Sequence, residues 1–490
     1  MAIEFRKIFE IFEKSEVITE KERLIDNYCK PFLESNSAVP LVAVLPHDTE
    51  QISKFIKYIR SLKEINVVLI SSKTSPKFLD DIIIRDNSAI IDLSRMKKIS
   101  FINKRNRVCV VEPGVTWSEL VIHLKERGMR PLAPLLPRPG KSALASILDR
   151  EPHLIPKKQF DISDPLFCME VVFGNGEIFR TGEAAGPLSI EKNRKAGAAL
   201  TNPLGPGQTD IFRIIQGSKG TYGCVSWISM QCDLIPEKRE VKFLELNTLE
   251  PLVEFIYMAV RKRLIDEAFV INDNLFNAIF LPRNSAPKKL VLIYAINGYD
   301  FLPEEKISYQ LEDSNDILKE MGLSAQNNVI SISQKDWEPI LDGNSVIHHP
   351  KYSDKVIAID MFYNTTLNRV QNHLLRVQEI LKKHNFPSNR FYFYLQPIIQ
   401  ARAANVEFSL LADRPDFKGG KKEVSLEKTK SICREIAQLV SKEGGFFSRS
   451  YSLINNIAFS ENNKILQESL KKLKRIFDPD GILNKGQLVF

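Results

Sequence analysis

Apolar and polar positions follow one another differently in the two halves of the chain. Before residue 115 the pattern is one of short apolar runs, at 39–46, 67–70, 89–93 and 107–112. Short runs bounded by turn residues are typical of buried strands. Between the first two runs, an Asp48 or Thr49 cap precedes apolar residues at helical spacing, namely Ile52, Phe55, Ile56 and Ile59. Strands and helices are therefore predicted to alternate in this part of the chain.

From about residue 240 the elements become longer. Helices are predicted over 250–265, 304–321, 366–385 and 426–443, with strands near 290–296, 356–363, 391–396 and 405–411. Between the two regions, Gly174-Asn175-Gly176 separates two apolar runs and predicts a hairpin. Residues 3–35 are predicted to be helical, because Ile8, Phe9 and Phe12 stand at helical spacing among many charges. The whole pattern predicts an α+β protein whose second part contains an antiparallel sheet.

The composition is that of an ordinary globular protein of two or three domains. The chain has 490 residues, of which 43% are hydrophobic and 26% charged, and its net charge is +8. Lysine and arginine are scattered, and the basic cluster 471–475 is typical of the solvated face of a helix, so nucleic-acid binding is not expected. The N-terminus lacks the apolar core of a signal peptide, and no apolar run reaches the ~18 residues that span a bilayer, so no direct membrane insertion is expected.

The cysteines carry no metal or redox motif. They lie at positions 29, 109, 168, 224, 232 and 433, and no pair has the CxxC spacing. This argues against a zinc knuckle, an iron–sulfur motif or a redox-active dithiol. Buried, reduced thiols are expected, and a cytoplasmic location fits them best. Any attachment at the inner face of a membrane is predicted to run through a partner protein.

Two glycine-containing segments far apart in the chain carry the most specific chemistry. The first, Gln216–Val225, reads QGSKGTYGCV and stands directly before an apolar strand, and the second, Phe477–Asn484, reads FDPDGILN. Glycine lets the backbone approach a ligand and adopt positive φ, and backbone N–H groups can bind the charge of a pyrophosphate. Taken alone, the first segment is explained equally well as a tight turn that enters a strand.

Two further segments, 112–117 (EPGVTW) and 173–182 (FGNGEIFRTG), precede these two motifs. The four segments, in this order, resemble the FAD-binding domain shared by vanillyl-alcohol oxidase, p-cresol methylhydroxylase and the D-subunit of glycolate oxidase. The resemblance to this PCMH-type family covers roughly residues 36–236 and 461–490. It implies an N-terminal helical segment (1–36), a two-subdomain FAD-binding domain (37–236), an α+β cap, or substrate, domain (237–460) and a C-terminal segment that returns to the FAD domain (461–490). It also implies noncovalent FAD, since the loop 71–78 holds neither histidine nor cysteine.

The resemblance assigns the FAD site to Ser71, Ser72, Lys73, Thr74, Pro113, Gly114, Ser142, Ser146, Gly217, Ser218, Gly220, Thr221, Gly223, Val225 and Asn484. Three departures from the family pattern add bulk or positive charge. The loops 71–77 and 142–146 contain no glycine, and Lys219 replaces the usual acidic residue. The hydroxyl groups and Lys73 of these loops can still bind a pyrophosphate. Without glycine, however, the backbone cannot approach the pyrophosphate as closely.

The cap region lacks the histidines of the family. Residues 396–407 and 443–446 take the places of its GHxGDGNLH-like and EHGIG-like motifs, and neither contains histidine, so no metal site is predicted. Catalytic roles are expected for His153 as a general base, for Arg402 as a carboxylate clamp, and for Tyr394 and Glu407. An ion pair of Arg402 with an acidic residue such as Glu407 explains the arginine equally well, and the tyrosine would also suit the core.

These features indicate an FAD-dependent dehydrogenase that oxidises a small organic substrate, either a 2-hydroxy acid or an aromatic alcohol or alkylphenol. Because the sequence has no metal-cluster motif, electrons are expected to pass to a partner in a hetero-oligomer, a related flavoprotein subunit or an iron–sulfur electron-transfer subunit. The lost glycines and histidines support an alternative, a catalytically degenerate paralogue that serves as a structural or assembly subunit of a flavoenzyme complex. A UDP-sugar reductase of the same fold is less favoured. Flavin absorbance of the purified chain separates the first two.

Overall fold

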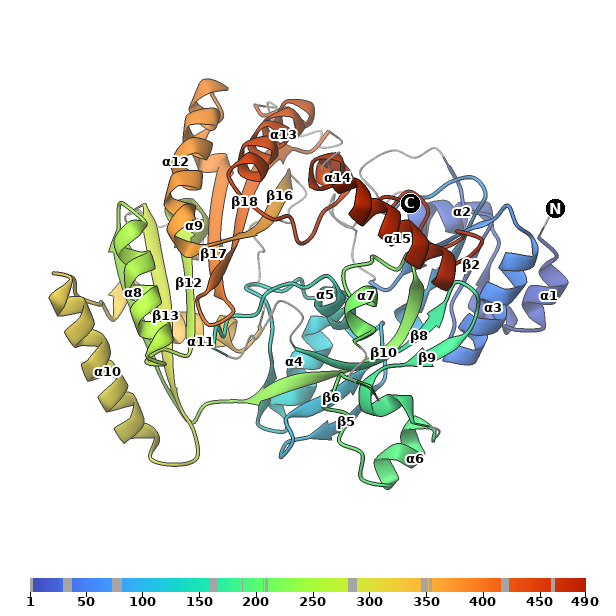
Figure 1. Ribbon diagram of the computed structural model, residues 1–490, viewed down its shortest axis with the longest axis horizontal. Coiled ribbons are helices and arrows are strands. Elements are labelled where there is room, and N and C mark those ends of the chain that lie inside the picture. Colours follow the sequence, from blue (N-terminus) through green and yellow to red (C-terminus); the bar gives the residue numbers. More distant parts are fainter. Residues whose placement is uncertain are drawn as a thin grey trace.

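The structure is a computed structural model that describes residues 3–29, 38–72, 82–157, 165–186, 188–205, 207, 210–280, 289–344, 351, 355–415, 423–459 and 463–490. Three main sheets organise these residues. The first two lie on one side of the molecule and the third on the other side (Figure 1). A small hairpin of β14 (Asn328–Val329) and β15 (Ile332–Ser333) stands apart from them.

The first sheet takes its strands from the N-terminal part of the chain. β2 (Val42–Val44), β4 (Ser88–Asp92) and β3 (Asn66–Ile70) are parallel, and β1 (Val17–Ile18) adds an antiparallel edge. α3 (Thr49–Ser61) covers this sheet with its predicted apolar face buried, and the Asp48 carboxylate caps the helix by accepting the Gln51 N–H. The opposite edge, β3, pairs with the C-terminal tail, where Val67 lies opposite Leu483.

The N-terminal segment is not the continuous helix predicted for residues 3–35. It folds as α1 (Phe5–Phe9), η1 (Lys14–Glu16), β1, α2 (Lys21–Leu24) and η2 (Ile25–Cys29). The prediction was wrong here because Val17 and Ile18 are β-branched and pair with β2, a contact that their local spacing did not reveal.

The second sheet is built around β10 (Gly223–Leu234). This strand pairs with β6 (Val108–Val111), β8 (Leu166–Phe173) and β7 (Met129–Pro131), while β5 (Ile99–Asn103) and β9 (Ile178–Arg180) lie outside them, all antiparallel. α4 (Trp117–Lys125) begins with a capping box formed by Thr116 and Glu119. The shorter helices of this part are α5 (Ala143–Leu148), α6 (Ile190–Lys195) and α7 (Phe212–Ile215).

The third sheet is antiparallel, in the order β11 (Lys238–Leu246), β13 (Leu290–Gly298), β12 (Glu267–Asn272), β17 (Phe391–Ile398), β18 (Ala403–Asp413) and β16 (Val356–Thr365). One face packs against α8 (Glu250–Arg261), α10 (Pro303–Glu320), α12 (Leu367–Lys383) and α13 (Leu426–Lys442). The other face packs against α9 (Asp273–Phe280), α11 (Gln334–Leu341) and three residues of the first half, Leu135, Leu136 and Leu154. The predicted α+β class with an antiparallel second part is confirmed.

The chain returns to the first sheet at its C-terminal end. α14 (Ser452–Ala458) and α15 (Lys464–Phe477) lead along the outside of the molecule (Figure 1), and Leu483 joins the core of the first sheet. Lys474 of α15 is buried, donates to the Thr221 carbonyl and pairs with the Asp478 carboxylate at 2.6 Å. α15 is thus tied to the loop before β10 and to the tail.

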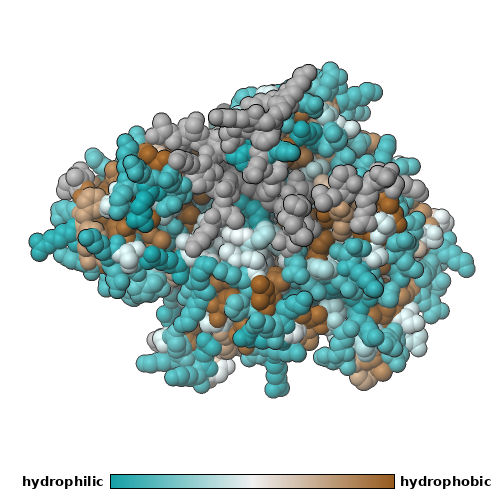
Figure 2. Space-filling view, turned by 180° about the vertical axis from the view of Figure 1, so that it is seen from behind, coloured by the Kyte–Doolittle hydropathy of each residue, from teal (hydrophilic) through white to brown (hydrophobic). Residues whose placement is uncertain are grey.

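Hydrophilic side chains cover most of the coloured surface in Figure 2, with smaller hydrophobic areas between them. Among the described residues, no helix is long and apolar enough to cross a membrane. The exposed large apolar side chains are spread over several elements, and α15 carries three of them, Ile465, Leu466 and Ile476.

Candidate functional site

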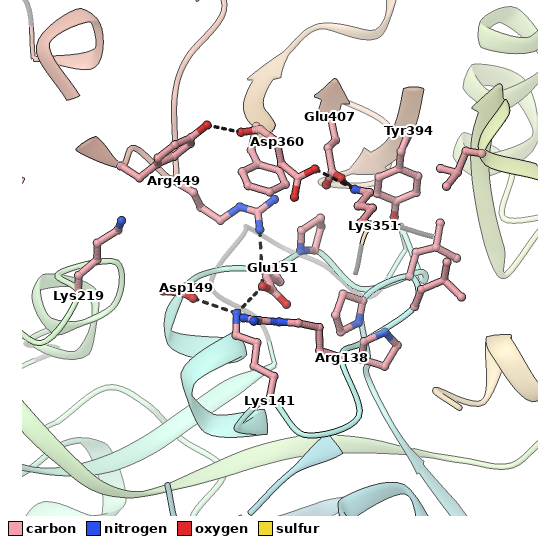
Figure 3. A pocket seen from close by; sticks show the side chains of 18 residues that line it. Arg138, Lys141, Asp149, Glu151, Lys219, Lys351, Asp360, Tyr394, Glu407 and Arg449 are labelled. Atoms are coloured by element: carbon pink, nitrogen blue, oxygen red, sulfur yellow. Dashed lines mark hydrogen bonds and ion pairs between the residues drawn. The ribbon is translucent and has the colours of Figure 1, made fainter. Parts of the chain in front are cut away.

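Two adjoining hollows are candidate binding sites, and only the smaller one is lined by residues of the third sheet. The larger, with a volume of about 680 Å³, is lined by the N-terminal segment, the ends of β3 and β4, α5, the loop that leads into β10 and the C-terminal tail. We call it the large cavity. The small pocket, of about 130 Å³, is lined by residues 134–138, by the loop after α5 and by side chains of β16, β17 and β18 (Figure 3). Lys141, Asp149 and Lys219 line both hollows, which therefore adjoin.

Asn484 joins two walls of the large cavity. Its side-chain oxygen accepts the Leu69 N–H at 3.0 Å, and its amide donates to the Lys219 carbonyl at 2.7 Å. It thereby ties the end of β3 to the loop before β10, which Lys474 holds from another side through the Thr221 carbonyl. Three segments that are distant in the sequence thus fix the shape of this cavity.

The polar groups of the large cavity suit a long anionic molecule. Its lining has five cationic side chains and two carboxylates, namely Arg23, Arg95, Lys141, Lys219, Lys485, Asp92 and Asp149. Within the described residues, the buried Ser218 hydroxyl and the Gln487 side-chain oxygen have no hydrogen-bond partner, and both residues line this cavity. Because buried polar atoms are nearly always hydrogen-bonded, these two indicate a ligand. Volume, charge and unpartnered polar atoms together fit a dinucleotide such as FAD.

Eight predicted cofactor residues line the large cavity, namely Ser71, Ser72, Pro113, Ser218, Gly220, Gly223, Val225 and Asn484. Five others do not line it, namely Gly114, Ser142, Ser146, Gly217 and Thr221. Lys73 and Thr74 lie outside the described residues. Sequence reasoning missed Arg23 and Tyr28 of the N-terminal segment and Gln487 of the tail, for which no motif gave a signal.

The predicted residues that lie off the wall shape the segments that form it. The Ser142 hydroxyl caps α5 by accepting the Ala145 N–H, and the Ser142 N–H donates to the Ser72 hydroxyl at 2.9 Å. The Thr221 hydroxyl donates to the Ser218 carbonyl at 2.8 Å. Their observed contacts are therefore within the protein, and a direct contact with the cofactor stays a prediction.

The glycines of the loop before β10 are required by close packing. A Cβ at Gly220, where φ is 69°, would lie 2.8 Å from the Asn484 amide nitrogen and 2.8 Å from Leu69 Cδ1. A Cβ at Gly223 would lie 2.5 Å from Val171 Cγ2. The space beside these glycines, which the sequence analysis assigned to a pyrophosphate, is thus also occupied by protein groups that close the cavity.

Replacing Gly220 is expected to weaken or abolish FAD binding, depending on the side chain introduced. Alanine would contact Asn484 and Leu69 and keep the unfavourable φ, and aspartate would add a carboxylate near the pyrophosphate. We expect roughly tenfold weaker binding for Gly220→Ala and no measurable flavin absorbance for purified Gly220→Asp. Gly197 has φ of 93° and no atom within 4 Å of its Cβ position, so Gly197→Ala and Gly197→Asp are matched controls. Full flavin content in Gly220→Asp would mean that the loop 217–223 is not the site.

Three strands of the third sheet present side chains to the small pocket. Phe362 of β16 and Tyr394 of β17 are both direct cross-strand partners of Glu407 on β18, so the three lie on one face. Asp360 lies two residues before Phe362 and shares that face (Figure 3). Burial raises the pKa of Tyr394, whose hydroxyl donates to the Gln396 side chain at 2.8 Å, so the phenol keeps its proton.

Lys351 lies between two of the pocket carboxylates. Its ammonium is 3.3 Å from Asp360 Oδ1 and also contacts Glu407, which accepts a hydrogen bond from the Ser409 hydroxyl at 3.2 Å. Burial lowers the pKa of Lys351 from its ordinary value, although the Asp360 carboxylate acts in the opposite direction. A buried amine of lowered pKa can accept and release a proton more easily than an exposed lysine.

Glu151 is the anionic centre of the opposite wall. It accepts hydrogen bonds from the Lys141 ammonium at 2.6 Å and the Ser146 hydroxyl at 2.5 Å, and Arg449 Nη1 lies 3.9 Å away (Figure 3). Burial alone would raise the pKa of Glu151, but Lys141 and Arg449 outweigh it and hold the pKa at about 2. Glu151 is therefore an ion-pair partner and a poor proton acceptor.

Arg449 reaches the pocket from the segment between α13 and α14. Its guanidinium lies over the Phe362 ring, 3.7 Å from the centroid, and its side chain is only 12% exposed. In the part of the chain that the structure describes, Arg449 Nε has no hydrogen-bond partner. A buried guanidinium with an unused donor at a pocket is suited to a carboxylate.

Acid is expected to remove the stabilisation that Glu151 provides. Because its folded pKa lies below the ordinary value of 4.5, this stabilisation is present above pH 4.5 and is lost as the pH falls towards 2. Between pH 7 and pH 3 the loss should be roughly 2 kcal/mol. Chemical denaturation at both pH values gives the unfolding free energies of the unaltered chain and of Glu151→Gln. The difference between the two proteins should be smaller at pH 3 than at pH 7. A constant difference would contradict the prediction, and Glu468→Gln on the exposed side of α15 is the control.

Of the four predicted catalytic residues, Tyr394 and Glu407 line the small pocket, and His153 and Arg402 do not. His153 is buried, and its Nδ1 accepts the Ile155 N–H at 3.2 Å. Arg402 is exposed. β17 ends at Ile398, and residues 399–401 have φ of 53°, 56° and 62°, so a left-handed turn carries Arg402 outside before β18 begins.

Sequence reasoning missed several charged residues of the small pocket, among them Lys351, Asp360 and Arg449. Asp360 left a signal, because it is a charge inside an otherwise apolar strand. Lys351 and Arg449 left none. Over the described ranges, no group of three or more His, Cys, Asp or Glu residues is placed to hold a metal ion.

Comparison with known proteins identifies the cofactor-binding part. Residues 40–182 match the FAD binding domain family. The mitochondrial D-lactate dehydrogenase [cytochrome] of Arabidopsis thaliana is 25% identical over 246 residues, which is 49% of this chain and 40% of that protein. The chain carries a PCMH-type FAD-binding domain. Its cofactor is FAD, and the predicted family resemblance is confirmed.

Two further relatives of this flavoprotein extend over nearly the whole chain. D-2-hydroxyglutarate dehydrogenase of Stutzerimonas stutzeri is 19% identical over 492 residues, which covers 98% of this chain and 97% of that protein. The structure of p-cresol methylhydroxylase with bound substrate superimposes with a TM-score of 0.79 at 16% identity, covering 99% of this chain and 96% of that one. At this identity the structural likeness establishes the shared fold.

Proposed function

We propose that this flavoprotein is an FAD-dependent dehydrogenase that oxidises a small 2-hydroxy acid in the small pocket. The observation that carries the proposal is Arg449, a buried guanidinium with an unpartnered Nε beside a pocket that adjoins the cofactor cavity. The pocket lining has five cationic side chains against four carboxylates, so a small anion has matching charge there.

An alkylphenol is the less favoured substrate class. The names of two relatives refer to 2-hydroxy acids, D-lactate and D-2-hydroxyglutarate. p-Cresol methylhydroxylase, named for a phenol, shares the fold at 16% identity. A neutral ring would leave the buried Arg449 Nε without an acceptor, whereas a carboxylate can accept its hydrogen bond.

FAD, when bound, supplies the hydride acceptor. Arg449 binds the substrate carboxylate and so orients the carbon to be oxidised. Lys351, in its neutral form, accepts the proton of the substrate hydroxyl, and Asp360 and Glu407 stabilise the ammonium that results. Leu135 and Leu136, with their flanking prolines, form an apolar wall that excludes water.

We assign cofactor binding to the large cavity and substrate binding to the small pocket. Residues 37–236 and 461–490 hold the cofactor, and residues 237–460 cover the substrate. In support, the tail supplies Asn484, Lys485 and Gln487 to the large cavity, and the third sheet supplies Asp360, Tyr394 and Glu407 to the small pocket. Residues of the N-terminal segment 1–36 also contribute to the large cavity.

A second protein receives the electrons. In support, the name of the plant relative includes the word cytochrome. We infer a hetero-oligomer with an electron-transfer subunit, or with a related flavoprotein subunit. Native mass measurement after gentle purification tests it, and a lone monomer that reduces dioxygen at a useful rate would oppose it.

Anaerobic mixing tests the substrate class. The FAD-loaded protein is mixed with D-lactate, L-lactate, D-2-hydroxyglutarate, 4-ethylphenol or vanillyl alcohol, and loss of the oxidised-flavin absorbance is followed. We expect reduction by a 2-hydroxy acid. Arg449→Lys should raise KM for that acid by roughly tenfold or more at unchanged flavin content, because lysine lacks the fork of donors. Arg376→Lys, an exposed arginine of α12, is the matched control.

Each other result has a defined meaning. Reduction by the phenols alone would overturn the substrate class. An FAD-loaded protein that none of these compounds reduces would favour the catalytically degenerate, structural subunit.

A further inference from the structure

α15 exposes apolar side chains that the described chain does not cover. Ile465 is 82% exposed, Ile476 64% and Leu466 47%. With 3.6 residues per turn, positions 465 and 476 fall on the same side of the helix, and Leu466 lies at the edge of that side. We call these three residues the apolar strip. On this side of the helix the exposed Ser469 and Lys472 lie between Ile465 and Ile476, so the strip is apolar at its two ends and polar between them. Large aliphatic side chains exposed to this degree on one side of a helix favour an interaction site.

The apolar strip is not the side by which α15 packs on the protein. Lys474, the buried residue of this helix, lies on the opposite side and is held by the Thr221 carbonyl and Asp478. Leu470 and Phe477 flank Lys474 and are partly buried. The helix is therefore fixed to the molecule by one side and presents the strip outward.

A row of cations accompanies the apolar strip. Lys464, Lys471, Lys472 and Arg475 are exposed on α15, and Glu468 is the exposed acidic residue among them. On the helical projection these cations lie together, next to the strip and away from the buried side. The exposed surface of α15 thus combines aliphatic side chains with an excess of positive charge.

We propose that α15 docks the protein on an anionic membrane surface. The apolar strip enters the boundary between headgroups and acyl chains, and the cations pair with anionic headgroups. A protein partner fits less well, because cores of protein interfaces are depleted in lysine and enriched in aromatic residues and methionine, whereas this surface is rich in lysine and has only isoleucine and leucine as its apolar members. Docking of this kind is peripheral and sensitive to salt.

Vesicle flotation tests the proposal on the full-length flavin-loaded chain. Vesicles of phosphatidylcholine alone and of phosphatidylcholine with phosphatidylglycerol are compared at low and high salt. We expect binding to the anionic vesicles that high salt weakens. The variants Ile465→Ser with Ile476→Ser, and Lys471→Glu with Lys472→Glu, should each bind at least about tenfold more weakly.

Matched controls are Leu375→Ser and Lys382→Glu on α12, an apolar and a basic residue exposed on another helix. Both should float like the unaltered chain, and all variants should keep their flavin absorbance and circular dichroism because the changed side chains are exposed. If the unaltered protein does not float with the vesicles, the proposal is overturned, and a protein partner becomes the favoured occupant of the strip. Equal binding of all variants would overturn it as well.

Discussion

Lys351→Arg is expected to lower kcat by roughly 10²- to 10⁴-fold while the FAD content stays unchanged. Arginine keeps the positive charge between Asp360 and Glu407, so the ion pairs of the pocket persist. Arginine cannot give up its proton in a protein, however, and so cannot accept one from the substrate. The rate of flavin reduction in a single turnover measures the effect directly, without contributions from the electron acceptor.

Lys355→Arg, an exposed lysine just before β16, is the matched control and should react like the unaltered protein. The pH dependence adds an independent check. Because the amine must be neutral to accept a proton, kcat/KM should rise with pH and level off above the folded pKa of Lys351, which burial places below the ordinary value of 10.5. A Lys351→Arg variant that keeps normal turnover would exclude Lys351 as the proton acceptor.

Lys474→Met should destabilise the protein by about 3–5 kcal/mol and reduce its FAD content, because it leaves the Asp478 carboxylate buried without its cation. Asp478 is 1% exposed and accepts the backbone N–H groups of Ile482 and Leu483, so the tail loses its anchor. The loop before β10 also loses the contact at the Thr221 carbonyl. Chemical denaturation and flavin absorbance measure the two effects separately.

Lys472→Met changes an exposed lysine of the same helix and should leave both quantities nearly unchanged. The double variant Lys474→Met with Asp478→Asn removes both charges and should recover part of the lost stability. A Lys474→Met protein with unchanged unfolding free energy would show that the tail is held mainly by its apolar contacts.

The first sheet and the loop before β10 could be predicted because their signals are local. The apolar run 67–70 and the Asp48 cap each lie within a few residues of the structure they specify. The failure at residues 3–35 has the opposite cause. Val17 and Ile18 form β1 because β2 lies beside them, and that neighbour is known only from the fold.

The small pocket could be predicted only in part, since its charges are brought together by strand pairing and loops. Lys351, Asp360 and Arg449 come from three separate segments, and no spacing in the sequence relates them. Arg402 was predicted to bind a substrate carboxylate because nothing in Ile399-Gln400-Ala401 suggests a left-handed turn, which glycine or asparagine usually marks.

The pairing of Val67 with Leu483 has a consequence for biosynthesis. β3 is an edge strand, and its outer side remains exposed until residues near 483 have left the ribosome. The large cavity likewise lacks Asn484 and Gln487 until then, so cofactor loading follows synthesis of the third sheet. During that interval the nascent chain offers an unpaired strand edge to other chains, a situation in which chaperones usually act.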